Sequence, residues 1–261
     1  MRFKILCISG LLLFQGSVLA GTHRETFEQT YPMRTGGKVV VSNTNGEVVV
    51  DTWERDEVRV VAEKVVRAGS SREAREIMER VRIHIKHEDD FLEIETDYPR
   101  FHDGFWNALF GRGINVTVSY RITAPRELDL HVSTVNGKIR VSDLRGKIGA
   151  HSTNGSIRII ESRGQIEAKT TNGRIEAELV DYDQDEDMYF KTTNGGIEVS
   201  FPRDFRAYIE ARTTNGRVRT DFPMKVKGEM SRRKIRGEIN GGGGRIVLHT
   251  TNGGIRILEG G

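Results

Sequence analysis

The sequence contains little cysteine, little proline and few aromatic residues, and neither sign of charge dominates. Its 261 residues include one Cys and five Pro, which exclude a disulfide-stapled miniprotein and a collagen-like chain. The 40 Lys and Arg residues nearly balance the 37 Asp and Glu residues, which excludes a disordered tail of one charge sign. Apart from a short apolar run near the N-terminus, no segment approaches the roughly 20 apolar residues of a membrane-spanning helix. The 29 Gly residues, about 11% of the chain against a usual ~7%, favour a β protein punctuated by glycine.

Residues 1–20 have the pattern of a secretory signal peptide. Arg2 and Lys4 precede an apolar run over residues 5–14, and Val18 and Ala20 occupy the −3 and −1 positions of a cleavage site. We therefore expect an exported protein, periplasmic, secreted or on the cell surface, and not a cytoplasmic one. An uncleaved membrane anchor is the alternative. Cleavage removes two of the 40 cations and leaves a net charge of +1, which does not favour a nucleic-acid partner.

A repeat built on Asn-Gly dominates the rest of the chain. Eight of the eleven Asn residues precede Gly, and Thr-Thr-Asn-Gly recurs at 170–173, 192–195, 213–216 and 250–253. The eight are Asn45, Asn136, Asn154, Asn172, Asn194, Asn215, Asn240 and Asn252. From Asn136 to Asn252, leaving out Asn240, the spacings are 18, 18, 22, 21 and 37 residues. They indicate an 18-residue period with two insertions and, last, two periods plus one residue, which is typical of a solenoid.

Each 18-residue period divides into two nine-residue units. Gly137, Gly146, Gly155, Gly164 and Gly173 are nine residues apart, and Asn and Arg alternate before them. The pattern Gly-x-Ile-x-apolar that follows has the period of two expected of a strand with one buried face.

The nine-residue pattern predicts stacked parallel strands joined by corners. At these corners Gly, and Asn beside it, tolerate positive φ. Stacking in register places the Asn and Thr side chains of successive corners about 4.8 Å apart, in hydrogen-bonded ladders. A meander of antiparallel hairpins with Asn-Gly turns is the alternative.

The region before the regular repeat predicts a cap on the N-terminal end of the stack. Ser70 and Glu73 form a capping box at the start of a helix near 71–82. Strands are expected near 58–66, 82–87, 91–96 and 114–122. We divide the chain into a signal peptide at 1–20, a cap region of strands and one helix at 21–130, and the Asn-Gly repeat at 131–261.

One order of motifs extends over most of the chain. Asp51-Thr52-Trp53 is followed by a short helix, by Tyr120-x-Ile122-x-Ala124-Pro125 and by repeated Thr-Thr-Asn-Gly-x-Ile. With these motifs, residues 35–261 resemble the bacterial DUF4097 family of adhesin-like β-strand repeat proteins. The resemblance implies an all-β fold, a right-handed parallel β-solenoid (β-helix) of about 18-residue coils, in an exported envelope protein. It brings no catalytic residues.

No common catalytic or nucleotide-binding motif is present in the sequence. Gly-x4-Gly-Lys, Gly-x-Ser-x-Gly and His-Glu-x-x-His are all absent. His84 and His87 are three residues apart on an expected strand, so their side chains point to opposite faces and do not suit one metal ion. We therefore expect neither enzymatic activity nor a cofactor. The alternative is a polysaccharide-acting β-helix enzyme, which requires carboxylates or cations that converge in one groove.

An acidic stretch at 181–187 is the candidate cation site. Asp181, Asp183, Asp185 and Asp187 alternate in a loop that coincides with the four-residue insertion in the repeat. Alternating carboxylates suit Ca²⁺, although the stretch lacks the EF-hand pattern. A solvated acidic loop is the alternative.

Two segments are candidate partner-binding surfaces. The basic segment, residues 225–236, is expected to be a loop between the last two coils. It has six cations and suits anionic lipid headgroups or a polyanionic glycan. The aromatic segment, residues 100–113, suits either an exposed anchor for a membrane or partner, or packing onto the cap. The residues selected in them are Lys225, Lys227, Arg232, Arg233 and Lys234, and Phe105, Trp106 and Phe110.

The final strand, near residues 254–258, follows the last Asn-Gly corner and ends the sequence given. We expect it to leave an open strand edge around Ile255, through which the protein self-associates or binds an envelope partner. Charged residues that block such pairing are the alternative.

Together these features predict a non-enzymatic, exported β-solenoid that acts as an adhesin-like binding or scaffolding surface in the bacterial envelope. Its expected partners are an envelope protein, a glycan or an anionic lipid surface, and not a nucleic acid. A periplasmic component of envelope-stress signalling is a further alternative, which the sequence does not separate from adhesion.

Overall fold

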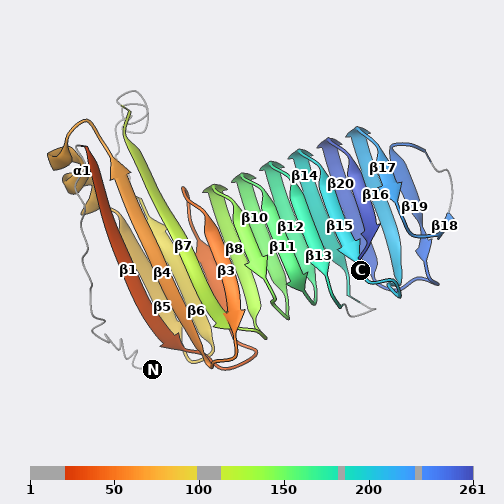
Figure 1. Ribbon diagram of the computed structural model, residues 1–261, viewed down its shortest axis with the longest axis horizontal. Coiled ribbons are helices and arrows are strands. Elements are labelled where there is room, and N and C mark those ends of the chain that lie inside the picture. The colour runs from red at the N-terminus through yellow and green to blue at the C-terminus, as the bar shows by residue number, and fades with distance from the viewer. Residues whose placement is uncertain (1–20, 99–112, 182–185, 227–230, 261) are drawn as a thin grey trace, which may run out of the picture.

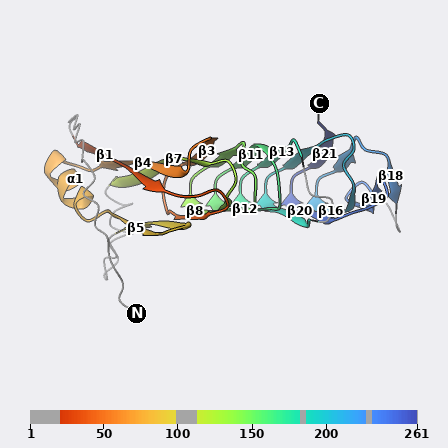
Figure 2. The ribbon, with the colours of Figure 1, turned by 90° about the horizontal axis from the view of Figure 1, so that it is seen from below.

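The computed structural model describes residues 21–98, 113–181, 186–226 and 231–260. Figure 1 shows a long array of strands with α1 (Ser71–Met78) at one end, and Figure 2 shows that the strands form two facing layers. Within these ranges the fold is all-β apart from this short helix, as the sequence predicted. The predicted signal peptide at 1–20 lies outside the described residues.

Each layer is one continuous sheet. The first has ten strands, in the spatial order β1 (Thr22–Pro32), β4 (Glu57–Arg67), β7 (Asn115–Pro125), β3 (Val48–Trp53), β9 (Ile139–Ser142), β11 (Ile157–Ser162), β13 (Ile175–Leu179), β15 (Ile197–Phe201), β21 (Ile255–Glu259) and β17 (Val218–Thr220). The second has eleven, in the order β18 (Met224–Val226), β19 (Lys234–Ile239), β16 (Ala207–Asn215), β20 (Arg245–Asn252), β14 (Met188–Asn194), β12 (Ile166–Asn172), β10 (Ile148–Asn154), β8 (Asp129–Asn136), β2 (Lys38–Ser42), β6 (Phe91–Asp97) and β5 (Arg82–Glu88).

The regular repeat pairs in parallel and in register. Ile148 lies opposite Leu130 and Ile166, and Ile157 lies opposite Ile139 and Ile175. The chain alternates between the two sheets, so that positions 18 residues apart become neighbours in one sheet. This pairing excludes the antiparallel meander for the regular repeat.

The core lies between the two layers. The inward positions predicted by the period of two are buried, with Ile157, Ile166, Ala150 and Ala168 at 0% exposure. Burying these aliphatic side chains on both sheets stabilises the layer packing, at roughly 25 cal/mol per Å² of apolar surface removed from water.

The Asn residues of the corners form the predicted ladder. Each Asn after the first donates its side-chain N–H to the Oδ1 of the Asn before it in the stack, at 2.7–2.8 Å. The Asn ladder runs in the spatial order Asn45, Asn136, Asn154, Asn172, Asn194, Asn252 and Asn215. Asn240 instead donates to the carbonyl oxygens of Arg203 and Phe205.

The Thr hydroxyl groups that lie two residues before Asn residues of the ladder also connect successive coils. Thr170 Oγ1 donates to Gly155 O at 2.9 Å, and Thr192 Oγ1 donates to Gly173 O at 2.9 Å. Both Thr side chains are buried. The first Thr of Thr-Thr-Asn-Gly therefore satisfies a corner carbonyl of the neighbouring coil.

Positive φ is the expected reason for glycine at the corners. This expectation holds for the glycines that follow Arg and is wrong for most of those that follow Asn. Gly146 and Gly164 have φ of +140° and +112°. Gly155 is not among the residues with positive φ. A Cβ at Gly155 would lie 1.8 Å from Gly137 O, so close approach of stacked backbones selects glycine there.

The N-terminal strands follow the expected boundaries closely, but α1 ends at Met78, four residues before the expected end at residue 82. Ser70 Oγ accepts a hydrogen bond from Glu73 N at 3.2 Å, which confirms the predicted cap of α1. The strands expected near 58–66, 82–87, 91–96 and 114–122 are β4, β5, β6 and β7. The helix packs against β1 and β4, at the end of the stack.

The C-terminal coil does not lie at the end of the stack. Strand β20 lies between β14 and β16, and β21 lies between β15 and β17. Accordingly, β20 and β21 lie within the array in Figure 1 and not at its end. The expected open edge around Ile255 is therefore wrong, because Ile255 is 0% exposed and pairs with both Ile197 and Val218.

The interval of 37 residues before the last Asn-Gly does not contain two solenoid periods. After β17 the chain forms the antiparallel pair β18–β19, and then returns to insert β20 and β21 between earlier strands. The basic segment, expected as a loop, thus contributes strands at the edge of the 11-stranded sheet.

Candidate functional site

The acidic stretch has its two described ends tied into the fold. Asp181 Oδ2 lies 2.9 Å from Arg163 Nη1, and Asp187 Oδ1 accepts a hydrogen bond from Arg245 N at 2.7 Å. Asp183 and Asp185 lie outside the described residues. Within the described ranges, no group of three or more His, Cys, Asp and Glu side chains could hold a metal ion. Binding of Ca²⁺ by this stretch stays a prediction.

The other predicted surfaces are only partly described. Phe105, Trp106 and Phe110 fall in 99–112, and Lys227 falls in 227–230, both outside the described residues. Lys225, Arg232, Arg233 and Lys234 are exposed around the β18–β19 pair. No helix in the described part of the chain is long and apolar enough to cross a membrane.

A groove of about 610 Å³ lies on the outer face of the 11-stranded sheet. This outer groove crosses β8, β10, β12, β14 and β20, and it is defined by the side chains that line it. They include Lys38, Asp129, His131, Lys147, Gln165, Glu167, Asp187, Tyr189, Arg245 and Val247. Its size falls within the range of ordinary ligand sites.

One outward glycine interrupts the row of side chains along the groove. His131, Gly149, Glu167, Tyr189 and Val247 occupy matching outward positions on five adjacent strands. A Cβ at Gly149 would lie 2.5 Å from His131 Nδ1, so the imidazole lies over the backbone of the next strand. The absence of a side chain at Gly149 therefore makes room for the His131 imidazole.

Charged groups surround the middle of the outer groove. Lys169 Nζ bonds to Glu167, and lies 5.0 Å from the ring centroid of Tyr189 in a cation–π contact. The hydrogen bond from Lys169 holds the pKa of Glu167 below its usual value. Glu167 therefore stays ionised near neutral pH.

The two imidazoles beside the groove contact each other edge to face, with ring centroids 5.1 Å apart. Burial lowers the pKa of His131, and the neighbouring His151 and Lys38 lower that pKa further, while Glu167 opposes the shift. His151 Nε2 lies 3.4 Å from Glu167 Oε1 and makes no hydrogen bond within the described residues. His131 is thus neutral near pH 7 and can accept or donate a hydrogen bond in the groove.

The carboxylates at the two ends of the groove have structural bonds. Asp129 Oδ1 accepts from Lys147 N at 3.0 Å, and Asp187 Oδ1 accepts from Arg245 N at 2.7 Å. These bonds hold each carboxylate against the backbone of the next coil. They provide the groove with hydrogen-bond acceptors in fixed positions.

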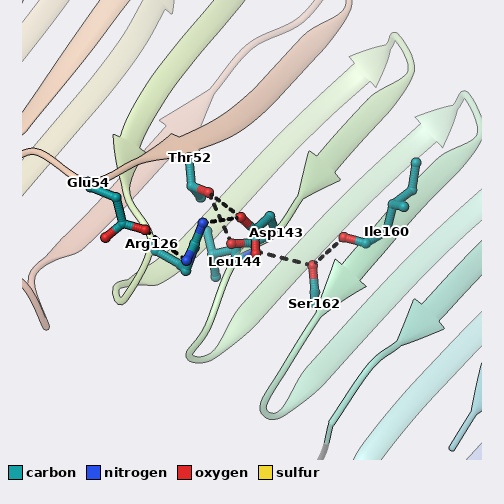
Figure 3. Close-up of polar contacts among 7 residues, drawn as sticks. All are labelled: Thr52, Glu54, Arg126, Asp143, Leu144, Ile160 and Ser162. Atoms are coloured by element: carbon teal, nitrogen blue, oxygen red, sulfur yellow. Dashed lines mark hydrogen bonds and ion pairs between the residues drawn. The ribbon is translucent and has the colours of Figure 1, made fainter.

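A second polar cluster lies near the Arg corners and joins distant parts of the chain (Figure 3). Arg126 pairs with Glu54 at 2.7 Å and with Asp143 at 2.8 Å, and Thr52 Oγ1 donates to Asp143 O at 3.1 Å. Ser162 is buried and donates its hydroxyl hydrogen to Ile160 O at 2.9 Å. These contacts fasten β3 to the corners of the following coils, which is a structural role.

Sequence reasoning missed the outer groove because no local motif marks it. The available signal was Gly149 itself, an outward glycine between the inward residues Ile148 and Ala150. The row of outward residues along the groove also depends on the insertion of β20 beside β14, which brings Val247 next to Tyr189. That long-range neighbour is not visible in the spacing of the repeat.

Comparison with known proteins gives a family match for more than half of the chain. Residues 115–258 match the Toastrack DUF4097 family model. A "putative cell adhesion protein" from Clostridium sporogenes is 12% identical, covers 90% of this chain and 100% of its own, and has a TM-score of 0.49. A "putative adhesin" from Bacteroides fragilis is 10% identical, covers 90% and 97%, and has a TM-score of 0.41. The comparison with curated proteins finds no match.

Proposed function

This chain belongs to the Toastrack DUF4097 family, and from that premise we propose that it is a non-enzymatic, adhesin-like binding protein of the bacterial envelope. The signal-peptide pattern of residues 1–20 supports export. In this proposal the repeat forms a right-handed solenoid of about 18-residue coils, the hand that parallel crossover connections almost always take. Such a stack is a stiff surface that presents the same face over many strands.

The observation that carries this proposal is the outer groove of about 610 Å³ on the 11-stranded sheet. It crosses the strands rather than entering the core, so it suits a segment of an extended chain. Tyr189 offers an aromatic ring, and His131 and Gln165 offer hydrogen-bonding groups. Ionised side chains of both signs line the rest. An extended polar polymer, such as a glycan, fits this combination best.

The rival is a polysaccharide-acting enzyme, because Asp129, Glu167 and Asp187 line the same groove. A glycosidase of the usual kind needs one carboxyl with a raised pKa as its general acid. The pKa of Glu167 is instead lowered, and both Asp side chains accept backbone hydrogen bonds. These features favour binding over hydrolysis.

A glycan array tests the proposal with the purified protein and three variants. We expect binding to one class of polar glycan, and at least a tenfold loss of affinity in Gly149→Thr, whose added side chain displaces the His131 imidazole, and in Tyr189→Ala. Tyr208→Ala is the matched control, since Tyr208 is an exposed tyrosine on the same sheet that does not line the groove. Equal affinity in all four proteins, or release of shortened glycan detected by mass spectrometry, would contradict the proposal.

A further inference from the structure

We propose a second binding site, on the opposite sheet, that takes a tetrahedral oxyanion such as phosphate or sulfate. It is a hollow of about 210 Å³ on the outer face of the 10-stranded sheet, near the edge of the sheet that β17 forms. We call it the arginine hollow. Its charged lining consists of Arg174, Arg217, Arg219, Arg256 and Glu198. The site is independent of the outer groove and of the proposed function.

Two glycines make the hollow. Gly196 and Gly254 immediately precede the adjacent strands β15 and β21, at the position that Arg174 occupies before β13 and Arg217 before β17. A Cβ would meet its nearest atom at 3.3 Å for Gly196 and at 3.4 Å for Gly254, and neither residue has positive φ. A Cβ at these two positions therefore needs only a small shift of its neighbours, whereas at Gly195 and Gly253, just before them, it would lie 2.0 Å from a backbone oxygen.

The register places the cations around this gap. Glu198, Arg256 and Arg219 are direct neighbours across β15, β21 and β17. Arg217 immediately precedes β17, two residues before Arg219, and lines the same hollow. The returning C-terminal coil thus brings together arginines from strands that are distant in the sequence.

The charges in the hollow do not balance. Glu198 Oε2 pairs with Arg256 at 2.5 Å, and Arg174 lies 3.4 Å from Glu176. Arg217 and Arg219 are exposed and have no acidic partner in the described part of the chain. Their guanidinium groups are free to bind an oxyanion through paired N–H donors, the geometry for which arginine is best suited.

The basic segment lies against the same strand. Val218 N donates to Arg232 O at 2.9 Å, which places residue 232 beside β17 between Arg217 and Arg219. The positive charge of residues 232–234 raises the local potential and favours an anion. The basic residues identified in the sequence therefore adjoin a formed site instead of an isolated loop.

Nuclear magnetic resonance of the arginine Nε–H groups tests the site with phosphate and with sulfate, at constant ionic strength. We expect saturable shifts of Arg217 and Arg219, and at least a fivefold weaker affinity in Arg217→Gln/Arg219→Gln. Gly254→Thr keeps every charge and fills the gap, so it should weaken binding to a similar degree. Lys138→Gln/Arg140→Gln is the matched control, because Lys138, just before β9, and Arg140, on β9, correspond to Arg217 and Arg219 in the strand register, and their replacement removes the same charge.

The result that would overturn the proposal is an equal loss of affinity in the two double variants, since only diffuse charge then attracts the anion. Unchanged binding in Gly254→Thr would equally exclude the hollow. Vesicles with phosphatidylglycerol separate the sources of the oxyanion. Vesicle binding that free phosphate displaces supports a headgroup in the hollow, and vesicle binding that it does not displace assigns the effect to a charged surface and contradicts the site.

Discussion

Asn215 donates its side-chain N–H to Asn252 Oδ1 at 2.8 Å, although Asn252 follows it by 37 residues. Asn252 in turn donates to Asn194, at 2.7 Å. The last copy of the motif is therefore inserted between two earlier copies. This insertion supplies Val247 to the outer groove and Arg256 to the arginine hollow, so both candidate sites depend on it.

The Asn ladder should stabilise the stack most where each amide has two partners. Asn172 donates to Asn154 and accepts from Asn194, both at 2.7 Å, whereas Asn215 ends the ladder. At about 0.5–1.5 kcal/mol for each hydrogen bond, Asn172→Ala should cost about 2 kcal/mol and Asn215→Ala about half of that. Urea unfolding measures both. Equal costs would show that the ladder bonds do not contribute to stability.

Adjacent glycines should differ sharply in their tolerance of a methyl group. A Cβ at Gly195 would lie 2.0 Å from Gly173 O, while a Cβ at Gly196 would lie 3.3 Å from Gly254 O. We expect Gly195→Ala to cost at least about 3 kcal/mol or to prevent folding, and Gly196→Ala to cost less than about 1 kcal/mol. Thermal unfolding followed by circular dichroism compares them. A stable Gly195→Ala protein would refute the close stacking of the corners.

Inward and outward positions of one strand should respond oppositely to a change of polarity. Ile157 is 0% exposed, so Ile157→Asp buries a charge without a partner and should prevent folding. Arg158→Ala removes only a surface ion pair with Glu176, and should cost less than about 1 kcal/mol. Differential scanning calorimetry gives the two melting temperatures. Similar shifts would contradict the assigned strand period.

Stability should fall as the pH drops from 7.5 to 5. Burial lowers the pKa values of His131 and His249 below 6.5. The neighbouring His151 and Lys38 lower the pKa of His131 further, and Lys191 and Arg212 lower that of His249. Below pH 6.5 the unfolded chain then binds more protons than the folded chain, which favours unfolding.

The acidic groups whose pKa values are shifted do not cause the loss of stability between pH 7.5 and 5. The pKa values of Glu167 and Glu210 are lowered from 4.5, so the stability that they contribute is lost only at more acidic pH. Urea unfolding at pH 5 and 7.5 measures the effect, and His131→Gln/His249→Gln should make it smaller. Higher stability at pH 5 than at pH 7.5 would contradict the burial of these imidazoles.

The sequence predicts local structure well because each strand repeats the same alternation. Ile148 and Ile166 are assigned to the core by that alternation, and Ser70 to the cap of α1 by its spacing from Glu73. The order of the coils is harder to predict. The Thr-Thr-Asn-Gly copies at 192–195, 213–216 and 250–253 are identical, so any of them fits beside any other.

The candidate sites are harder to predict for the same reason. Their lining side chains become neighbours only through the order of the strands, as with Tyr189 and Val247 or Arg219 and Arg256. The basic segment was recognisable from its charge alone. Its strand β19 and its contact with β17 depend on long-range pairing that no local motif encodes.

Disulfide cross-linking tests the insertion of the C-terminal coil most directly. Arg256 lies in register between Glu198 and Arg219, so neighbouring pairs are about 4.8 Å apart and the outer pair about 10 Å. In a Cys7→Ser background, Glu198→Cys/Arg256→Cys and Arg219→Cys/Arg256→Cys should form disulfides on mild oxidation. Glu198→Cys/Arg219→Cys should not, because a disulfide needs a Cα separation of roughly 4.4–6.8 Å. Efficient cross-linking of that outer pair would show that the coils stack in sequence order, and would contradict the account.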